Sequence, residues 1–300
     1  MNGWTLTNVF EINGRLTVAD TVEEAISIYR RWAQGEEIRK ISQVYGGTDN
    51  YNALIAEPVV CSRQGWDLTH ITFTGVDEWT DIDRLVSIQQ RYPKAEFGVL
   101  MSKHWNENGN RYPSPEFIGN LHGRGLRLSA HLCGSLARKV IQMGFSGGID
   151  EPFRTLLHDF RRAQLNVSGC KEAINYDTNF IDSYPLEEVI IQQGDDRQLF
   201  EQCYINSGEH IAILLDKSGG LGIDTPIGFP PYAHRVHVGF AGGINPDNVI
   251  DKMNIITTSS LVGKFWIDME SGVRTDDRFD LDKVEDVCKK VYDEFLTEKG

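Results

Sequence analysis

Short apolar segments alternate with amphipathic segments along most of the chain after residue 66. Apolar residues at helical spacing predict helices in 81–92, 117–125, 153–163 and 280–296. The apolar segments between them predict eight strands, at 69–76, 95–102, 126–134, 163–169, 187–193, 210–216, 236–242 and 264–270. This alternation over about 230 residues predicts an α/β fold, a (β/α)8 TIM barrel. A doubly wound open sheet is the alternative, but the glycine-rich turn expected after its first strand is absent.

The first 66 residues show a different pattern. Asn13 and Gly14 lie between two alternating segments and predict a β-hairpin. Thr21, with Glu24 three residues later, predicts a capped helix. We therefore divide the chain into an N-terminal hairpin-helix extension with its connecting loop (1–66) and a barrel (67–300). The extension is expected to cover the barrel bottom, to form an oligomer contact such as that of a homodimer, or to act as a lid, and the sequence leaves these alternatives open.

Composition and charge narrow the class of protein. The chain is 40% hydrophobic and 24% charged, which is typical of a globular protein. Its net charge of −13 argues against a nucleic-acid partner, which needs a basic surface, and against an anionic membrane surface. No apolar stretch approaches the roughly 18 residues that span a bilayer, and no secretory signal follows Met1.

Cysteine and histidine spacing shows no metal signature. The five cysteines are scattered without a CxxC pair, and the eight histidines form no HExxH motif. This pattern predicts free thiols in a reducing, cytoplasmic environment, and we expect neither a metal ion nor a cofactor.

Polar residues alternate with apolar ones on several predicted strands, and they gather toward the carboxyl ends, where barrel enzymes place their active sites. Because successive side chains of a strand point to opposite faces, one polar face of each strand is expected to point toward the barrel axis. These polar faces comprise Thr72 and Thr74, then Arg127, Ser129, His131 and Cys133, and then Gln164, Asn166 and Ser168. They would either satisfy one another or line a polar ligand pocket. We favour the pocket, because buried polar groups without partners are costly.

Two features point to acid catalysis and anion binding. Asp216 ends the apolar sixth strand, where a carboxyl group can act as a general acid, or instead cap the following turn. In GFAGGINPDN (239–248), the glycines offer backbone N–H groups, and Asn245 and Pro246 suit the start of a helix. Such a junction favours phosphate, and barrels commonly complete a phosphate site with the loop after the eighth strand, here ESGVR (270–274).

Five segments resemble the phosphoribosylanthranilate isomerase family, whose members are (β/α)8 enzymes of tryptophan biosynthesis. The segments are LLDKSGGLG (214–222), GFAGGINPDNV (239–249), IDMESGVR (267–274), RYPSPE (111–116) and, more loosely, QLNVSG (164–169). The resemblance runs through most of residues 69–295 and leaves the N-terminal extension unmatched. It implies an Amadori-type isomerisation of a phosphorylated aldose derivative to a ketose.

The resemblance also implies roles for individual residues. Asp216 matches the general acid, and Arg111 matches the arginine that orients the aromatic part of the substrate. The positions that match the phosphate-binding loops are Gly220, Gly242, Gly243, Ser271 and Gly272.

Two departures from the family pattern affect the expected chemistry. Thr74 stands where the family has its catalytic cysteine, and a threonine hydroxyl is too weak an acid to replace a thiolate base. We therefore predict His131 or Cys133 as the general base, with Thr74 and Asn166 binding substrate. Glu270 replaces a serine beside the expected phosphate, so either its side chain turns away or the ligand is not an ordinary phosphate ester; Arg274 would offset its charge.

Three functions remain as hypotheses at this point. The first is an isomerase of a phosphosugar with a shifted substrate or base. The second is an epimerase, aldolase or lyase that acts on a phosphorylated substrate with the same barrel. The third is a non-catalytic protein that binds a phosphorylated metabolite or a partner.

Overall fold

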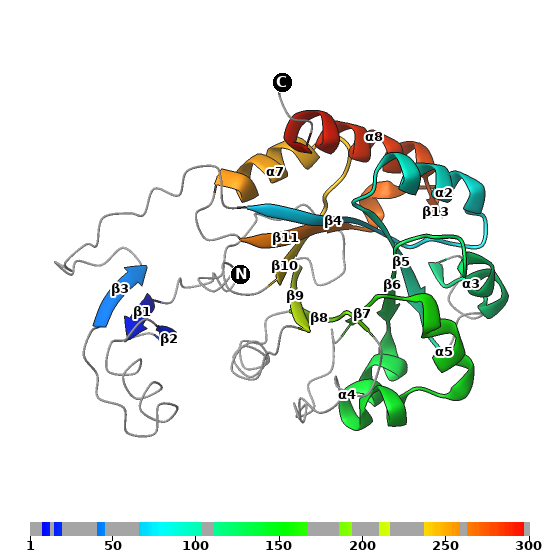
Figure 1. Cartoon of the computed structure of the whole chain (residues 1–300), viewed down its shortest axis with the longest axis horizontal. Helices are drawn as coiled ribbons and strands as arrows, with labels where there is room; N and C mark the ends of the chain where they lie inside the picture. The colour runs from blue at the N-terminus through cyan, green and yellow to red at the C-terminus, as the bar shows by residue number, and fades with distance from the viewer. Residues whose placement is uncertain are drawn as a thin grey trace.

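A closed barrel of parallel strands forms the body of the protein (Figure 1), in the order β10-β11-β4-β5-β6-β7-β8-β9. The computed structural model describes residues 8–12, 15–19, 41–45, 66–103, 111–166, 186–193, 210–216, 237–258 and 263–296. The barrel strands are β4 (Asp67–Thr74), β5 (Ala95–Met101), β6 (Leu128–Leu132), β7 (Arg162–Leu165), β8 (Glu188–Gln193), β9 (Ile211–Asp216), β10 (His237–Ala241) and β11 (Lys264–Met269). The predicted (β/α)8 barrel is confirmed.

Helices lie around the outside of the strands (Figure 1): α2 (Ile82–Arg91), α3 (Pro115–Leu121), α4 (Gly134–Gly148), α5 (Glu151–Leu156), α7 (Val249–Thr258) and α8 (Leu281–Val291). Side-chain caps start three of them. Asp81 accepts a hydrogen bond from the Arg84 N–H, and Ser114 and Asp280 cap α3 and α8 in the same way. Short elements complete the described chain, namely η2 (Leu157–Asp159), η4 (Ser271–Val273), β12 (Arg274–Thr275), β13 (Arg278–Phe279) and η5 (Tyr292–Leu296). No helix in these ranges is long and apolar enough to cross a membrane.

The core has two parts, because successive side chains of each strand point alternately outward to the helices and inward to the barrel axis. One face of each strand packs against the helices, as Phe73, Phe97 and Ala130 do. The other face fills the barrel, where Leu214 and Trp266 belong to a separate apolar cluster. The carboxyl ends of the strands are therefore left with polar side chains above a packed interior.

A buried charged network centred on Arg162 accompanies the apolar cluster inside the barrel. The Arg162 guanidinium donates to Glu96 Oε1 and to Glu188 Oε2, both at 2.8 Å, and its Cζ lies 4.3 Å from the centroid of the Trp266 ring. Thr72 donates to Glu96 Oε1 at 2.9 Å, so strands β4, β5, β7 and β8 are tied together through this network. Only 2% of the Arg162 side chain is exposed, so the guanidinium has lost its hydration. Its bonds to the two carboxylates offset the free-energy cost of that loss.

The N-terminal hairpin is confirmed as two antiparallel strands, β1 (Asn8–Ile12) and β2 (Arg15–Ala19), with Ile12 opposite Arg15. A third strand, β3 (Ile41–Tyr45), pairs with β1 and was not predicted, because its five residues are too few to display a clear period. The helix predicted from Thr21 lies outside the described residues. The three strands form a sheet of their own, and the boundary at residue 66 stays a prediction.

Two of the predicted strands that end earlier than expected carry candidate site residues at their ends. The segment predicted as 126–134 ends at Leu132, because Gly134 adopts a positive φ of 58° and Cys133 becomes the N-cap of α4. Helix α4 was not among the predicted helices, since its glycines weaken the helical pattern, and Gly144 interrupts the helical geometry. Strand β7 ends at Leu165, so Asn166 follows the strand, and Ser168 lies outside the described residues.

Candidate functional site

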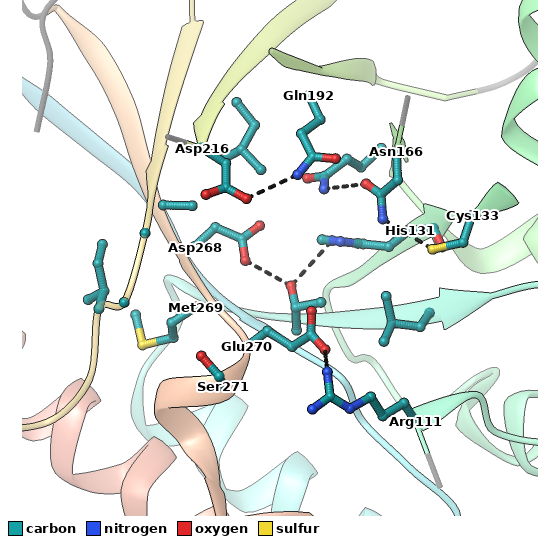
Figure 2. A pocket seen from close by; sticks show the side chains of 18 of the residues that line it. Arg111, His131, Cys133, Asn166, Gln192, Asp216, Asp268, Met269, Glu270 and Ser271 are labelled. Atoms are coloured by element: carbon teal, nitrogen blue, oxygen red, sulfur yellow. Dashed lines mark hydrogen bonds and ion pairs between the residues drawn. The ribbon is translucent and has the colours of Figure 1, made fainter. Parts of the chain in front are cut away.

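A cavity of about 410 Å³ opens at the carboxyl ends of the barrel strands. Figure 2 shows Asp216, Asp268 and His131 pointing into the same space from different strands. Polar side chains dominate its floor: Thr74 (β4), His131 (β6), Gln164 (β7), Gln192 (β8), Asp216 (β9) and Asp268 (β11). The predicted inward face is therefore observed for β4, β6 and β7, and the polar pocket lies where the strand alternation placed it.

The structure brings most of the predicted site residues to this one cavity. Those that line it are Thr74, Arg111, His131, Cys133, Asn166, Asp216, Gly242, Gly243 and Ser271. Gly272 lies just behind the lining, in contact with the backbone of Ile244. Gly220 lies outside the described residues. The roles assigned to these residues remain predictions.

A chain of amides borders the Asp216 side of the cavity. The amide of Gln192 donates to Asp216 Oδ2 at 3.1 Å, and the amide of Gln164 donates to Asn166 Oδ1 at 2.7 Å (Figure 2). The amide of Asn166 donates to Cys133 Sγ at 3.1 Å. The side-chain carbonyl oxygens of Gln164 and Gln192 are buried without a hydrogen-bond partner among the described residues. These two acceptors are suited to hydroxyl or amine donors from a ligand.

Asp268 is a buried carboxyl group that the sequence reasoning missed. Its Oδ1 accepts a hydrogen bond from Thr74 Oγ1 at 2.8 Å, and its Oδ2 is buried without a partner in the described part of the protein. Burial raises the pKa of Asp268 to about 8, although the hydrogen bond from Thr74 works in the opposite direction. The alternation in KFWIDM (264–269) could have found it, because Asp268 shares the inward face with Trp266.

The two residues predicted as alternative bases differ in their protonation. Burial lowers the pKa of His131 to about 4, so its imidazole is neutral near pH 7 and can accept a proton. Burial raises the pKa of Cys133 to about 11, so its thiol stays protonated there. Of these two groups, only His131 is in the form that a base requires.

The loops that follow β10 and β11 pack closely against each other. In the loop after β10, Gly242 and Gly243 adopt φ values of 114° and 68°, which favour glycine. In the loop after β11, Gly272 lies so close to the first loop that a Cβ on it would lie 1.9 Å from the Ile244 carbonyl oxygen. Asn245 caps the turn that leads into α7, which itself begins at Val249, because its Oδ1 accepts from the N–H groups of Asp247 and Asn248. Those donors are taken by the cap, so the glycine turn is the part of this junction suited to an anion.

Glu270 lines the cavity and is paired there with an arginine. Arg111 Nη1 lies 3.0 Å from Glu270 Oε1, and Arg111 Nε donates to Asp277 Oδ1 at 3.0 Å (Figure 2 shows the first contact). Burial raises the pKa of Glu270, while the charges of Arg111 and Arg274 act against this rise. Arg274 is itself buried and donates to the Gly75 carbonyl oxygen at 2.7 Å. The charge of Glu270 is thus balanced by two arginines, the nearer of which is Arg111.

No cluster of three or more histidine, cysteine, aspartate or glutamate side chains suited to a metal ion occurs among the residues that the structure describes.

Comparison with known proteins gives structural matches only. No family model matches the chain, and no curated protein matches its sequence. The structure is similar to monomers of the dimeric phosphoribosylanthranilate isomerase from Thermotoga maritima (19% identity, 74% of this chain and 97% of that chain, TM-score 0.48). It is also similar to N-(5'-phosphoribosyl)anthranilate isomerase from Pyrococcus furiosus (15% identity, 75% and 99%, TM-score 0.48). A truncated 3-deoxy-D-arabino-heptulosonate 7-phosphate synthase from Thermotoga maritima matches at 10% identity (77% and 88%, TM-score 0.44).

These identities and TM-scores are low, and the matches add nothing to the barrel that the strand pairing already shows. Enzymes with the same fold perform different reactions. The residues of the cavity, and not the fold alone, therefore indicate the function.

The contact between the two loops leads to a testable expectation. Gly272→Ala places a methyl group against the Ile244 carbonyl oxygen and forces the loops apart. We expect affinity for inorganic phosphate, measured by isothermal titration calorimetry, to fall by about tenfold or more, the equivalent of one lost hydrogen bond to a charged group. Gly119→Ala in α3 is the control, because a Cβ there meets no atom within 4 Å. Equal phosphate affinity in the two variants would remove these loops from the anion site.

Proposed function

We propose that this protein is an enzyme that isomerises a phosphorylated sugar derivative, converting an aldose to a ketose by an Amadori-type rearrangement. The observation that carries the proposal is the presence of two carboxyl groups, Asp216 and Asp268, in one cavity. They lie on β9 and β11, and β10 between them ends in the glycine turn Gly242–Gly243. Isomerisation needs a general acid, a general base and a phosphate-binding site, and the two carboxyl groups and the glycine turn can supply all three.

Asp216 is the proposed general acid. Its Oδ2 accepts the hydrogen bond from Gln192, which orients the carboxyl group at the cavity wall. In the proposed reaction Asp216 protonates the ring oxygen as the sugar opens, and a base then removes the proton from C2. The phosphate would bind at the glycine turn and at Ser271, which lines the same cavity.

The amide carbonyls support a substrate rich in hydroxyl groups. Gln164 Oε1 and Gln192 Oε1 are buried acceptors that no described residue satisfies, and an open-chain sugar offers several hydroxyl donors. The part of the site that would receive an aromatic carboxylate is less favourable, because Arg111 is already paired with Glu270 and Asp277. This favours a phosphosugar whose remaining part is not an aromatic acid.

The same pairing of Arg111 supports a second candidate function, a non-catalytic protein that binds a phosphorylated metabolite. In that case the carboxyl groups would only accept hydrogen bonds from the ligand. The epimerase, aldolase and lyase alternatives stay open as well.

One assay separates these candidates. The purified protein is incubated with phosphoribosylanthranilate and with a panel of phosphorylated aldoses and aldosylamines, and ketose formation is followed by NMR. Turnover of phosphoribosylanthranilate would support the tryptophan-pathway reaction, and turnover of another phosphosugar alone would support the shifted substrate. Calorimetric binding without turnover would support the non-catalytic candidate, and absence of both binding and turnover across the panel would contradict the proposal.

A further inference from the structure

Asp268 Oδ2 is a buried oxygen that no described residue satisfies, at the floor of a cavity. The carboxyl group is 5% exposed, and its other oxygen is held by Thr74. A buried carboxyl oxygen without a partner is costly, and such atoms in a native protein call for an explanation. A ligand in the cavity is the partner that the geometry offers.

Thr74 fixes where this carboxyl group points. Its hydroxyl donates to Asp268 Oδ1, and on its other side it lies 3.5 Å from His131 Nε2. Gly98 makes room for this arrangement, since a Cβ there would lie 2.6 Å from Thr74 Oγ1 and 2.9 Å from His131 Nε2. Three strands, β4, β5 and β6, therefore cooperate to hold one oxygen of Asp268 and leave the other to the cavity.

We infer that Asp268 is the group that removes the C2 proton of the substrate, and that Thr74 is the positioning residue that holds it; the inference rests on the proposed isomerase function. It assigns the role of base to a residue other than His131 and Cys133, the two candidates predicted from the sequence. The cysteine expected on the first strand is absent, but Asp268 reaches the same place from β11, 2.8 Å from the Thr74 hydroxyl. His131 then lies behind Thr74 as a neutral neighbour of this pair.

The proposed reaction is balanced within the substrate and two carboxyl groups, those of Asp216 and Asp268. The ring opens when Asp216 protonates the ring oxygen, which leaves a C1=N iminium or C1=O carbonyl. The Asp268 carboxylate takes the proton from C2, the C2–H electron pair forms the C1=C2 bond, and the C1 double-bond pair moves to the nitrogen or oxygen. The Asp268 carboxyl group then returns its proton to C1, and the O2 proton passes to the Asp216 carboxylate, which gives the ketose. In the carbonyl case O1 also regains the proton that it lost when the ring opened.

Charged and titratable groups surround Asp268 on several elements. From the strands packed around it they are Glu96 on β5, His131 on β6, Arg162 on β7 and Asp216 on β9, with Glu270 following β11. Burial raises the pKa of Asp268 to about 8, and Glu96 and Glu270 act in the same direction, whereas Thr74 and Arg162 lower it. A base must be ionised to accept a proton, so kcat/KM is expected to rise with pH through about 8 and then level off.

Substitution of Asp268 tests the inference. We expect Asp268→Asn to lower kcat by about 10²- to 10⁴-fold with little change in KM, and to abolish the rise of kcat/KM near pH 8. The matched control is Asp83→Asn on α2, an exposed aspartate distant from the lining residues. Wild-type turnover that persists in Asp268→Asn with its pH inflection would overturn the inference and leave the isomerase proposal standing. A wild type that binds phosphosugars without turning them over would instead contradict the proposed function, and the inference with it.

Thr74 variants test the same inference without altering the carboxyl group. Thr74→Val removes the hydrogen bond that lowers the pKa of Asp268, so we expect the inflection to move to higher pH and kcat to fall by about tenfold. Thr74→Ser keeps the hydroxyl and is expected to restore both. A purely structural role of Thr74 would reduce stability without moving the inflection, and that result would contradict the positioning role.

Stability provides a readout that needs no substrate. The pKa of Asp268 in the folded protein, about 8, lies above its unfolded value of 3.8, so the folded state binds this proton more tightly. The resulting stabilisation is present below the unfolded pKa and is lost as pH rises toward 8. Between pH 6 and pH 9 the urea midpoint is expected to fall more for the wild type than for Asp268→Asn. Parallel decreases in the two proteins would show that burial does not raise the pKa of Asp268, and would contradict the expected rise of kcat/KM near pH 8.

Discussion

Asp216→Asn is expected to lower turnover of the phosphosugar substrate by about 10²- to 10⁴-fold, the usual contribution of a positioned general acid. Asparagine has nearly the same shape as aspartate but carries no carboxyl proton to deliver. The side chain can still meet the Gln192 amide through its carbonyl oxygen, so the wall of the cavity is expected to keep its form. Steady-state kinetics and phosphate binding, measured side by side, check this expectation.

The control for Asp216→Asn is Asp286→Asn, which removes a partly exposed carboxylate that pairs with Lys290 on α8. This variant is expected to retain full activity, because exposed ion pairs contribute about 1 kcal/mol or less to stability. The decisive comparison is kcat against phosphate affinity. Loss of kcat with retained phosphate affinity supports the role as acid, whereas equal loss of both would show that Asp216 only maintains the site.

Arg162→Met is expected to destabilise the protein by about 3–5 kcal/mol, because it leaves buried Glu96 and partly buried Glu188 without their shared cation. Glu96 and Glu188 each accept a hydrogen bond from Arg162 at 2.8 Å. Burial alone would raise the pKa of Glu188, but the hydrogen bond from His237 and the charge of Arg162 hold it below its usual value. Glu188 therefore contributes stability that is present at neutral pH and is lost as pH falls through its lowered pKa.

Without Arg162, the dependence of stability on pH is expected to reverse its sign. The carboxyl groups are then expected to bind protons more tightly in the folded protein, so the loss of stability in Arg162→Met should be larger at pH 8 than at pH 5. Arg161→Met is the matched control, since Arg161 is 60% exposed and pairs with exposed Glu187. Its expected effect on urea unfolding is within about 0.5 kcal/mol. Similar losses in the two variants would contradict the assigned importance of the buried network.

The strand alternation predicted the barrel and, for three of its strands, the face on which the site lies. Because a side chain changes face at every residue, the polar positions at Thr74, His131 and Gln164 could be assigned to the interior before their contacts were known. The glycine turn at 242–243 was predictable for a different reason, since few residues other than glycine adopt its φ values.

Protonation could not be predicted in the same way. Cys133 and His131 were equal candidates for the base in sequence, and only burial separates them, because it keeps the thiol protonated and the imidazole neutral. Asp268 was missed because its importance depends on a contact with Thr74, 194 residues away in sequence. Likewise, the balance of Glu270 by Arg111 depends on how two loops meet.

The most direct test of the proposed isomerisation is a carbon NMR experiment on the wild-type protein with a phosphorylated aldose labelled with ¹³C at C2. We expect the C2 signal to move from the alcohol region to the ketone region as the aldose becomes a ketose. We also expect this conversion to accelerate as pH rises through about 8, the pKa of Asp268. A bound phosphosugar whose C2 remains an alcohol carbon, or whose carbon chain is cleaved, would contradict the account.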